Sequence, residues 1–359
     1  MRFAFAFSAL LAFSACAGAQ PHGGTDTVPT PTERHVRPIQ LVGPVADRAS
    51  EISGLTWYGD TLVILPQYPA RFAVGSDSVD AQNRGGDRGA LFALSRAEIE
   101  AYLDASAPAP LRPWAVPFEA PGVPGTILGF EGYEAVAFRD GQVFMTIEFE
   151  HESNIQGYLI AGTVAPHLGG VRLDTTSLQP LPSQTRIGNL SYETILLVPG
   201  GVVALQEANG TVVNPHPEAY VFDPTLAMRD SLSIPNVEYR LTDATSLDAA
   251  GRFWALNYFY PGDRLLLQPA PDSLAIEFGD GPTHRRFHTV ERLVEMQYTG
   301  DEIVRTDHAP IQLELLGDDR PRNWEGIARL GTRGFLMATD KFPETMLAFV
   351  AASPPAADE

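Results

Sequence analysis

The stretch NWEGIARLGTRGFLMATDK, residues 323–341, contains the pattern that decides the fold. A polar residue is followed by an apolar stretch of period two, a tight turn and a second apolar strand, which together predict a β-hairpin. Four further segments repeat this pattern: EISGLTWYGDTLVILPQ (51–67), GYEAVAFRDGQVFMTIE (132–148), LSYETILLVPGGVVALQE (190–207) and TDATSLDAAGRFWALNY (242–258).

The register of the five segments is nearly constant. Each has one marked residue, and the second strand begins eight to ten positions after it; the marked residues are Ser53, Glu134, Glu193, Thr245 and Glu325. A further strand-like run follows every hairpin. Short antiparallel strands in radially repeated units predict an all-β fold, a β-propeller. We expect five blades, with six possible only if an insertion hides another unit.

The strand-like run RPIQLVG (37–43) precedes the first unit, and the last unit stops after its third strand. We therefore expect the N-terminal strand to supply the outer strand of the last blade and close the ring. The first and fourth units carry insertions, and Ser95 with Glu98 predicts a capping box that opens a short helix in the first.

The N-terminus has the pattern of an export signal, with Arg2, an apolar run and then Cys16. We interpret residues 1–16 as this signal, with Cys16 as a lipidation site; ordinary cleavage near Ala19 is the alternative. Residues 17–35 read as a flexible linker, 36–352 as a single propeller domain and 353–359 as a disordered tail. We expect an exported protein: an outer-membrane or cell-surface lipoprotein, or a periplasmic or secreted one.

Composition excludes several classes of function. The net charge of −19 disfavours nucleic acid and anionic membrane surfaces as partners, so contact with a membrane is expected only through a lipid anchor. Cys16 is the only cysteine, which excludes a disulfide framework and thiolate catalysis. The hydrophobic content of 44% suffices for a large core, and we expect a monomer.

The five marked residues should meet at one mouth of the central channel, because the first strand of every blade lines the axis of a propeller. Three carboxylates and two hydroxyls form an oxygen ring that suits a hard cation, and Ca²⁺ is the predicted ion. Zinc is excluded because no His or Cys stands in the ring. The alternative is that these side chains satisfy strand-end amides around a water-filled channel. The candidate metal ligands are Ser53, Glu134, Glu193, Thr245 and Glu325.

A second set of residues should lie beside this ring, since antiparallel pairing places the end of each second strand opposite the beginning of the first. Among them, Glu148, Glu207 and Asp340 are candidates for a general base, and Lys341 is a candidate electrostatic clamp. The densest basic patch, His284 to His288, reads as a solvated loop or as an anion-binding lid.

At these motifs the chain resembles the bacterial phytase-like propeller family, described as having esterase-like activity of phytase. The resemblance rests on EISGLTW (51–57), YEAVAF (133–138), YETILLVPGG (192–201), LTDATSLDAAGRFWALNYF (241–259) and NWEGIARLGTRGFLMATDKFPETMLAFV (323–350). It implies hydrolysis of an ester or phosphoester. The marked residues also resemble, more distantly, the central site of calcium-activated nucleotidases (apyrases), which implies calcium.

Two functions follow as hypotheses. The first is a Ca²⁺-dependent phosphoric-ester hydrolase that acts on a small-molecule ester or phosphoester. The second is a non-catalytic envelope propeller that binds a ligand or partner and uses a central cation only for structure. A propeller fold alone does not choose between them.

Overall fold

The computed structural model describes residues 30–150, 155–188, 190–317 and 320–353. The predicted export signal with Cys16, most of the predicted linker and residues 354–359 lie outside this part of the chain. In the described residues, no helix combines the length and the apolar character that crossing a membrane requires.

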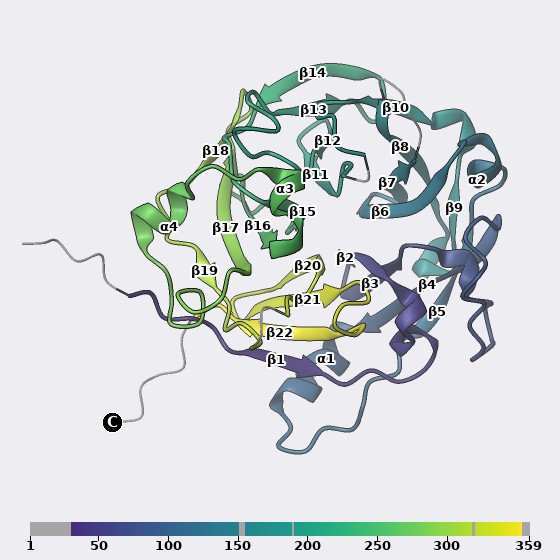
Figure 1. Ribbon diagram of the computed structural model, residues 1–359. Helices are drawn as coiled ribbons and strands as arrows, with labels where there is room; N and C mark the ends of the chain where they lie inside the picture. Colours follow the sequence, from purple (N-terminus) through teal and green to yellow (C-terminus); the bar gives the residue numbers. More distant parts are fainter. Residues whose placement is uncertain (1–29, 151–154, 189, 318–319, 354–359) are drawn as a thin grey trace, which may run out of the picture.

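Five blades surround a central channel (Figure 1), which confirms the propeller fold. The first blade consists of β2 (Ile52–Tyr58), β3 (Thr61–Pro66), β4 (Arg88–Ser95) and β5 (Trp114–Glu119). The second consists of β6 (Phe130–Arg139), β7 (Gln142–Phe149), β8 (Ile155–Val164) and β9 (Val171–Leu173), with β10 (Gln179–Pro182) beside β8. The third is β11 (Thr194–Val198), β12 (Gly201–Leu205), β13 (Glu218–Phe222) and β14 (Met228–Ser233). The fourth is β15 (Arg240–Ala244), β16 (Arg252–Phe259), β17 (Val290–Tyr298) and β18 (Ile303–Arg305), with β19 (Ile311–Gln312) beside β17.

The fifth blade joins the two ends of the chain. It consists of β20 (Trp324–Leu330), β21 (Gly334–Thr339), β22 (Leu347–Ala351) and β1 (Val36–Ile39), and β1 pairs antiparallel with β22. Val36 lies opposite Val350 and Ile39 opposite Leu347, and all four are buried. The predicted closure by the N-terminal strand is thus confirmed, with a strand that ends four residues earlier than the predicted run.

The short helices lie in the connections. They are α1 (Arg96–Asp104), α2 (Val123–Thr126), α3 (Arg264–Leu267) and α4 (Ser273–Phe278), with 3₁₀ turns at Pro44–Ala46, Arg48–Ser50, Pro69–Arg71, Pro166–Leu168, Thr175–Ser177 and Pro261–Asp263. Helix α1 begins with the predicted capping box, in which Ser95 and Glu98 exchange hydrogen bonds. The insertion of the fourth blade supplies α3 and α4, and α3 lies near the channel (Figure 1).

The core lies between the blades, because each sheet buries both faces against its neighbours. Separate apolar clusters fill the five interfaces; for example, Leu91 of the first blade packs in one cluster with Met145 of the second, and Leu205 of the third with Phe253 of the fourth. One pairing was not predicted: β5 and β9 run parallel and join the outer edges of the first two blades.

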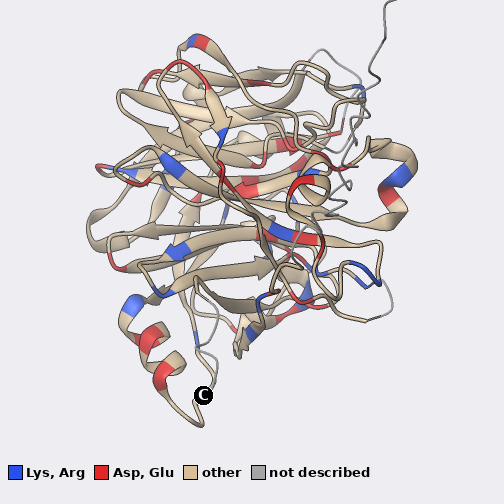
Figure 2. Ribbon diagram, turned by 90° about the vertical axis from the view of Figure 1, so that its left-hand side faces the viewer, with Lys and Arg blue, Asp and Glu red and all other residues tan. Residues whose placement is uncertain are grey.

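Part of the predicted linker is folded against the domain, which corrects the boundary drawn at residue 36. The backbone of Arg34 donates to Gln312, and the buried carboxylate of Glu33 accepts hydrogen bonds from the backbone and Nδ1 of His284. The basic patch around His284 therefore binds an anion of the chain itself. Acidic positions are spread over the ribbon rather than gathered at one end (Figure 2).

Candidate functional site at the channel mouth

Bulges in the inner strands present the predicted acidic residues at one end of the channel. The pairing register shifts at Ser53, Glu134 and Glu325, so that one extra residue is accommodated at each of these positions. Glu193 directly precedes β11. A bulged residue leaves the ladder and its side chain is re-aimed, which explains how equivalent positions of four blades turn toward one axis.

Thr245 does not belong to this set. It follows β15, and its backbone N–H and hydroxyl oxygen pair with Trp254. In the fourth blade the register shifts between Leu241 and Ala244, and Asp243 takes the equivalent place, because it directly precedes Ala244 as Ser53 precedes Gly54. Its carboxylate accepts hydrogen bonds from the backbone N–H groups of Ala244 and Ile327. Of the five predicted ring residues, Thr245 is therefore the one that lies outside the equivalent positions.

Arg240 supplies a positive charge among the carboxylates. Its Nη2 lies 3.5 Å from Glu193 Oε1 and 3.7 Å from Glu325 Oε1, and its Nε donates to Glu207. Asn257 holds the strand in place by donating to the backbone oxygen of Arg240 at 3.0 Å. Sequence reasoning missed Arg240. The available signal was an arginine three residues before Asp243, the acidic position of the fourth blade.

Burial shifts the acid–base equilibria of this cluster. Desolvation raises the pKa of Glu134 to about 7, and a hydrogen bond from Gln67 at 3.0 Å acts against the shift. Desolvation, followed by repulsion among the carboxylates, also raises the pKa values of Glu148, Glu193 and Glu325. Burial opposes the charged form of Arg240, but the surrounding carboxylates outweigh this effect and raise its pKa.

The cluster has more acceptor oxygens than donors. Glu148 Oε1, Glu193 Oε2 and Glu207 Oε2 are buried and receive no hydrogen bond from described residues. Protons on the carboxyl groups would satisfy these oxygens, consistent with the raised pKa values. As the side chains lie, no group of three or more Asp, Glu, His or Cys in the described ranges is arranged to hold a metal ion. The calcium hypothesis stays a prediction.

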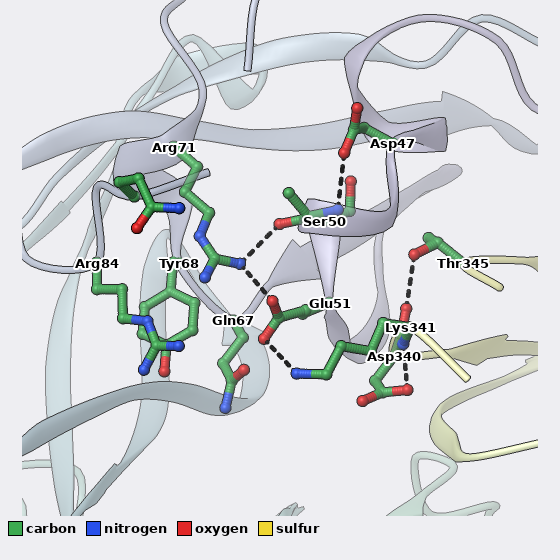
Figure 3. A network of polar contacts seen from close by, with 12 residues as sticks. Asp47, Ser50, Glu51, Gln67, Tyr68, Arg71, Arg84, Asp340, Lys341 and Thr345 are labelled. Carbon is green, nitrogen blue, oxygen red and sulfur yellow. Dashed lines mark hydrogen bonds and ion pairs between the residues drawn. The ribbon is translucent and has the colours of Figure 1, made fainter. Parts of the chain in front are cut away.

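A second network lies at the rim of the mouth (Figure 3). Glu51 accepts from Arg71 at 2.7 Å and from Lys341 Nζ at 3.0 Å. Burial alone would raise the pKa of Glu51, but these two cations lower it. Asp340 accepts from the backbone N–H groups of Lys341 and Phe342, and burial raises its pKa. Lys341 is the only lysine of the chain, a fact visible in the sequence.

A cavity of about 590 Å³ opens beside this cluster. Arg240, Arg320 and Asp263 provide its charged groups, and Tyr260 and Phe342 provide exposed aromatic surface. Burial raises the pKa of Asp263, and the charge of Arg240 limits the rise. Arg320 forms no ion pair with any described residue. None of the predicted catalytic residues lines this cavity, whereas Asp263 and Arg320, which do line it, were not predicted. The predicted residues are Glu148, Glu207, Asp340 and Lys341.

Comparisons with known proteins assign no family to the chain. No family model and no curated protein matches the chain. A structure search finds a protein of Bifidobacterium bifidum assigned as an exo-β-1,3-galactanase, at 9% identity and a TM-score of 0.48, covering 90% of this chain and 98% of that one. It also finds an α-L-arabinofuranosidase of Podospora anserina, at 13% identity and a TM-score of 0.42, covering 90% of this chain and 98% of that one. A third structure is an α-L-arabinanase of Cellvibrio cellulosa, at 7% identity and a TM-score of 0.42, covering 82% of this chain and 89% of that one. The propeller assignment made here rests on the strand pairing.

Proposed function

We propose that the chain is a hydrolase of small anionic esters, with a phosphoric ester as the substrate. The observation that carries this proposal is the cavity in which Arg320, Arg240 and Asp263 face the same space. A guanidinium without an ionic partner is a ready ligand for phosphoryl oxygens, since its planar fork donates two parallel hydrogen bonds. The resemblance of the sequence motifs to phytase-like propellers agrees with this chemistry.

In the proposed reaction, Arg320 binds the phosphoryl group and Asp263 accepts a proton from the water that attacks phosphorus. The P–O bond to the alcohol breaks, and the protonated Asp263 returns the proton to the leaving oxygen, so that the alcohol and inorganic phosphate are released. A carboxylate with a raised pKa is a stronger base than an ordinary aspartate, and burial raises the pKa of Asp263. Arg240 is already paired with three carboxylates and adds positive potential from the floor of the site. Lys341, held by Glu51, extends the positive charge along the rim.

Calcium is not used in this reaction. The predicted carboxylate ligands of calcium are Glu134, Glu193 and Glu325, and two of them, Glu193 and Glu325, contact Arg240 instead. A bound calcium ion would supply charge for a phosphoryl oxygen and lower the pKa of a bound water. In the proposed site, the guanidinium of Arg240 provides this positive charge at the bottom of the cavity.

A second candidate is hydrolysis of a glycosidic bond. It is favoured by the several carboxyl groups with raised pKa values near the cavity, since this chemistry uses one protonated and one ionised carboxyl group. The exposed rings of Tyr260 and Phe342 would suit the apolar face of a sugar. An uncharged sugar would not need Arg320, and this difference separates the two candidates.

The test is a substrate panel with a phosphate monoester, a carboxylic ester and aryl glycosides, each measured with and without a calcium chelator. We expect chelator-resistant turnover of the phosphate monoester. Asp263→Asn should lower kcat by about a hundredfold, in the range for loss of a general base, and Arg320→Gln should mainly raise KM. Arg333→Gln, at an exposed arginine paired with Asp104, is the control for lost charge.

Three outcomes would contradict the proposal. Turnover of a glycoside that is unaffected in Arg320→Gln would select the second candidate. Turnover that disappears with the chelator would return calcium to the site. Absence of turnover on the whole panel, with ligand binding retained, would select the non-catalytic envelope propeller.

A further inference from the structure

The central channel contains a second cavity, at the end opposite the carboxylate cluster. The inner strands all run in the same direction along the axis, and in the first, second, third and fifth blades the residues that line this cavity come after the marked positions. Its volume is about 170 Å³. This is room for a few waters or one small oxyanion, and it is below the size of cavities that bind drug-sized ligands. All five blades contribute, for example through Trp57, Val136, Leu197, Asp248 and Arg329.

Arg329 brings an uncompensated charge to this cavity. Its Nε and Nη2 atoms are buried and have no hydrogen-bond partner among the described residues. Only its backbone oxygen is engaged, accepting from Trp57 Nε1 at 2.9 Å. Arg329 as a whole is half-buried, but its two buried donor atoms without a partner carry a desolvation cost that a bound anion would offset.

The two carboxylates in the cavity accept hydrogen bonds from groups other than Arg329. Asp248 accepts from Arg252 Nε at 3.1 Å and from two backbone N–H groups. Asp243 accepts from the backbone N–H groups of Ala244 and Ile327, both at 2.8 Å. Neither carboxylate lies within ion-pair distance of Arg329 in the described part of the chain. The cavity therefore has hydrogen-bond donors without partners and carboxylate acceptors that already have partners. At the acidic mouth, by contrast, the acceptors lack partners.

We propose that this end of the channel is a binding site for a small oxyanion, a phosphate or a carboxylate, held by Nε and Nη2 of Arg329. The exposed Ser246 lines the same cavity and offers a hydroxyl donor at its opening. The proposal is independent of the hydrolase proposal, because the two cavities share no residue.

The experiment measures thermal stability and calorimetric binding with inorganic phosphate, acetate and chloride at constant ionic strength. The full chain should gain stability saturably with phosphate or acetate, and the stronger of the two identifies the class of oxyanion. Arg329→Met keeps most of the apolar stem but removes the buried charge. It should melt higher than the wild type in a zwitterionic buffer and bind the oxyanion at least about tenfold more weakly.

Arg333→Gln removes an arginine close in sequence, at the β20–β21 turn, and should keep the oxyanion effect. Equal stabilisation by chloride, or an equal effect in Arg329→Met, would mean general screening and overturn the site. A lower melting temperature of Arg329→Met in the zwitterionic buffer, with no oxyanion effect in the wild type, would mean that Arg329 is satisfied by water, and this too would overturn it. If Arg329→Met does not fold, Ser246→Phe, which fills the opening, should block binding of the oxyanion.

Discussion

Arg240 decides the character of the acidic mouth at the scale of single residues. A ring of carboxylates needs protons or a cation to exist in a buried place, and here a side chain of the same molecule brings that cation. Burial of a charge is tolerated only when it is paired, and the three ion pairs of Arg240 meet this condition. The result is a cluster whose charge depends on pH.

Glu134→Gln tests this dependence. Desolvation raises the folded-state pKa of Glu134 from 4.5 to about 7, so between these values the folded protein binds more protons than the unfolded chain. The free energy of unfolding should therefore fall as pH rises from 4.5 to 7, by about 3 kcal/mol from this group. In Glu134→Gln this decline should be smaller, as measured by urea unfolding at several pH values.

Glu302→Gln is the matched control, because Glu302 is exposed. It should reproduce the pH profile of the wild type. Identical profiles for Glu134→Gln and the wild type would show that Glu134 titrates with an ordinary pKa in the folded protein.

Several site residues were predictable and others were not. Glu134, Glu193 and Glu325 follow from the repeat register, because a bulge at the start of an inner strand recurs in the sequence pattern. Thr245 was wrongly equated with them, since the fourth blade has four residues, Leu241 to Ala244, opposite three residues of its partner strand, Ala255 to Asn257. Asp263 belongs to an insertion without a counterpart in the other blades, so no repeat could predict its place.

At the scale of elements, the hairpins were predictable because period-two apolar runs and tight turns are local signals. The second strands begin within one residue of their predicted starts, as in β7, which begins at Gln142 rather than Val143. The parallel contact of β5 with β9 was not predictable, because it joins segments far apart in sequence through backbone pairing of only two residue pairs.

Ile39→Ala tests the closing strand. Ile39 is 3% exposed and packs in the cluster between the fifth and first blades. Loss of its side chain should lower the free energy of unfolding by about 3 kcal/mol, as for other buried isoleucines. Val42→Ala, at a residue 36% exposed just beyond β1, should change it by less than about 0.5 kcal/mol. Equal effects of both variants in urea unfolding would show that β1 does not hold the ring closed.

At the scale of the whole molecule, the net charge of −19 draws cations toward the protein in general. A specific calcium site must be separated from this background. Because Arg240 fills the acidic mouth, we expect the melting temperature of the wild type to respond equally and weakly to calcium and magnesium. Arg240→Gln frees three carboxylates and should create a selective, saturable stabilisation by calcium.

Differential scanning calorimetry with both ions and with a chelator checks this expectation. A chelator-sensitive melting temperature of the wild type would place calcium in the native mouth. The double variant Glu193→Gln plus Glu325→Gln would then abolish the response. Without such sensitivity, the charge of the mouth is balanced by Arg240 and protons.

The closing strand also orders events during synthesis. Residues 36–39 are made before their partners, residues 347–350, with the four other blades made in between. Until then, the first blade exposes the apolar face that the fifth will cover, including Leu62 and Ile64. A growing chain can stack its early blades on one another, but the ring stays open to aggregation, and to chaperones that bind apolar strands, until residues 347–350 have been made.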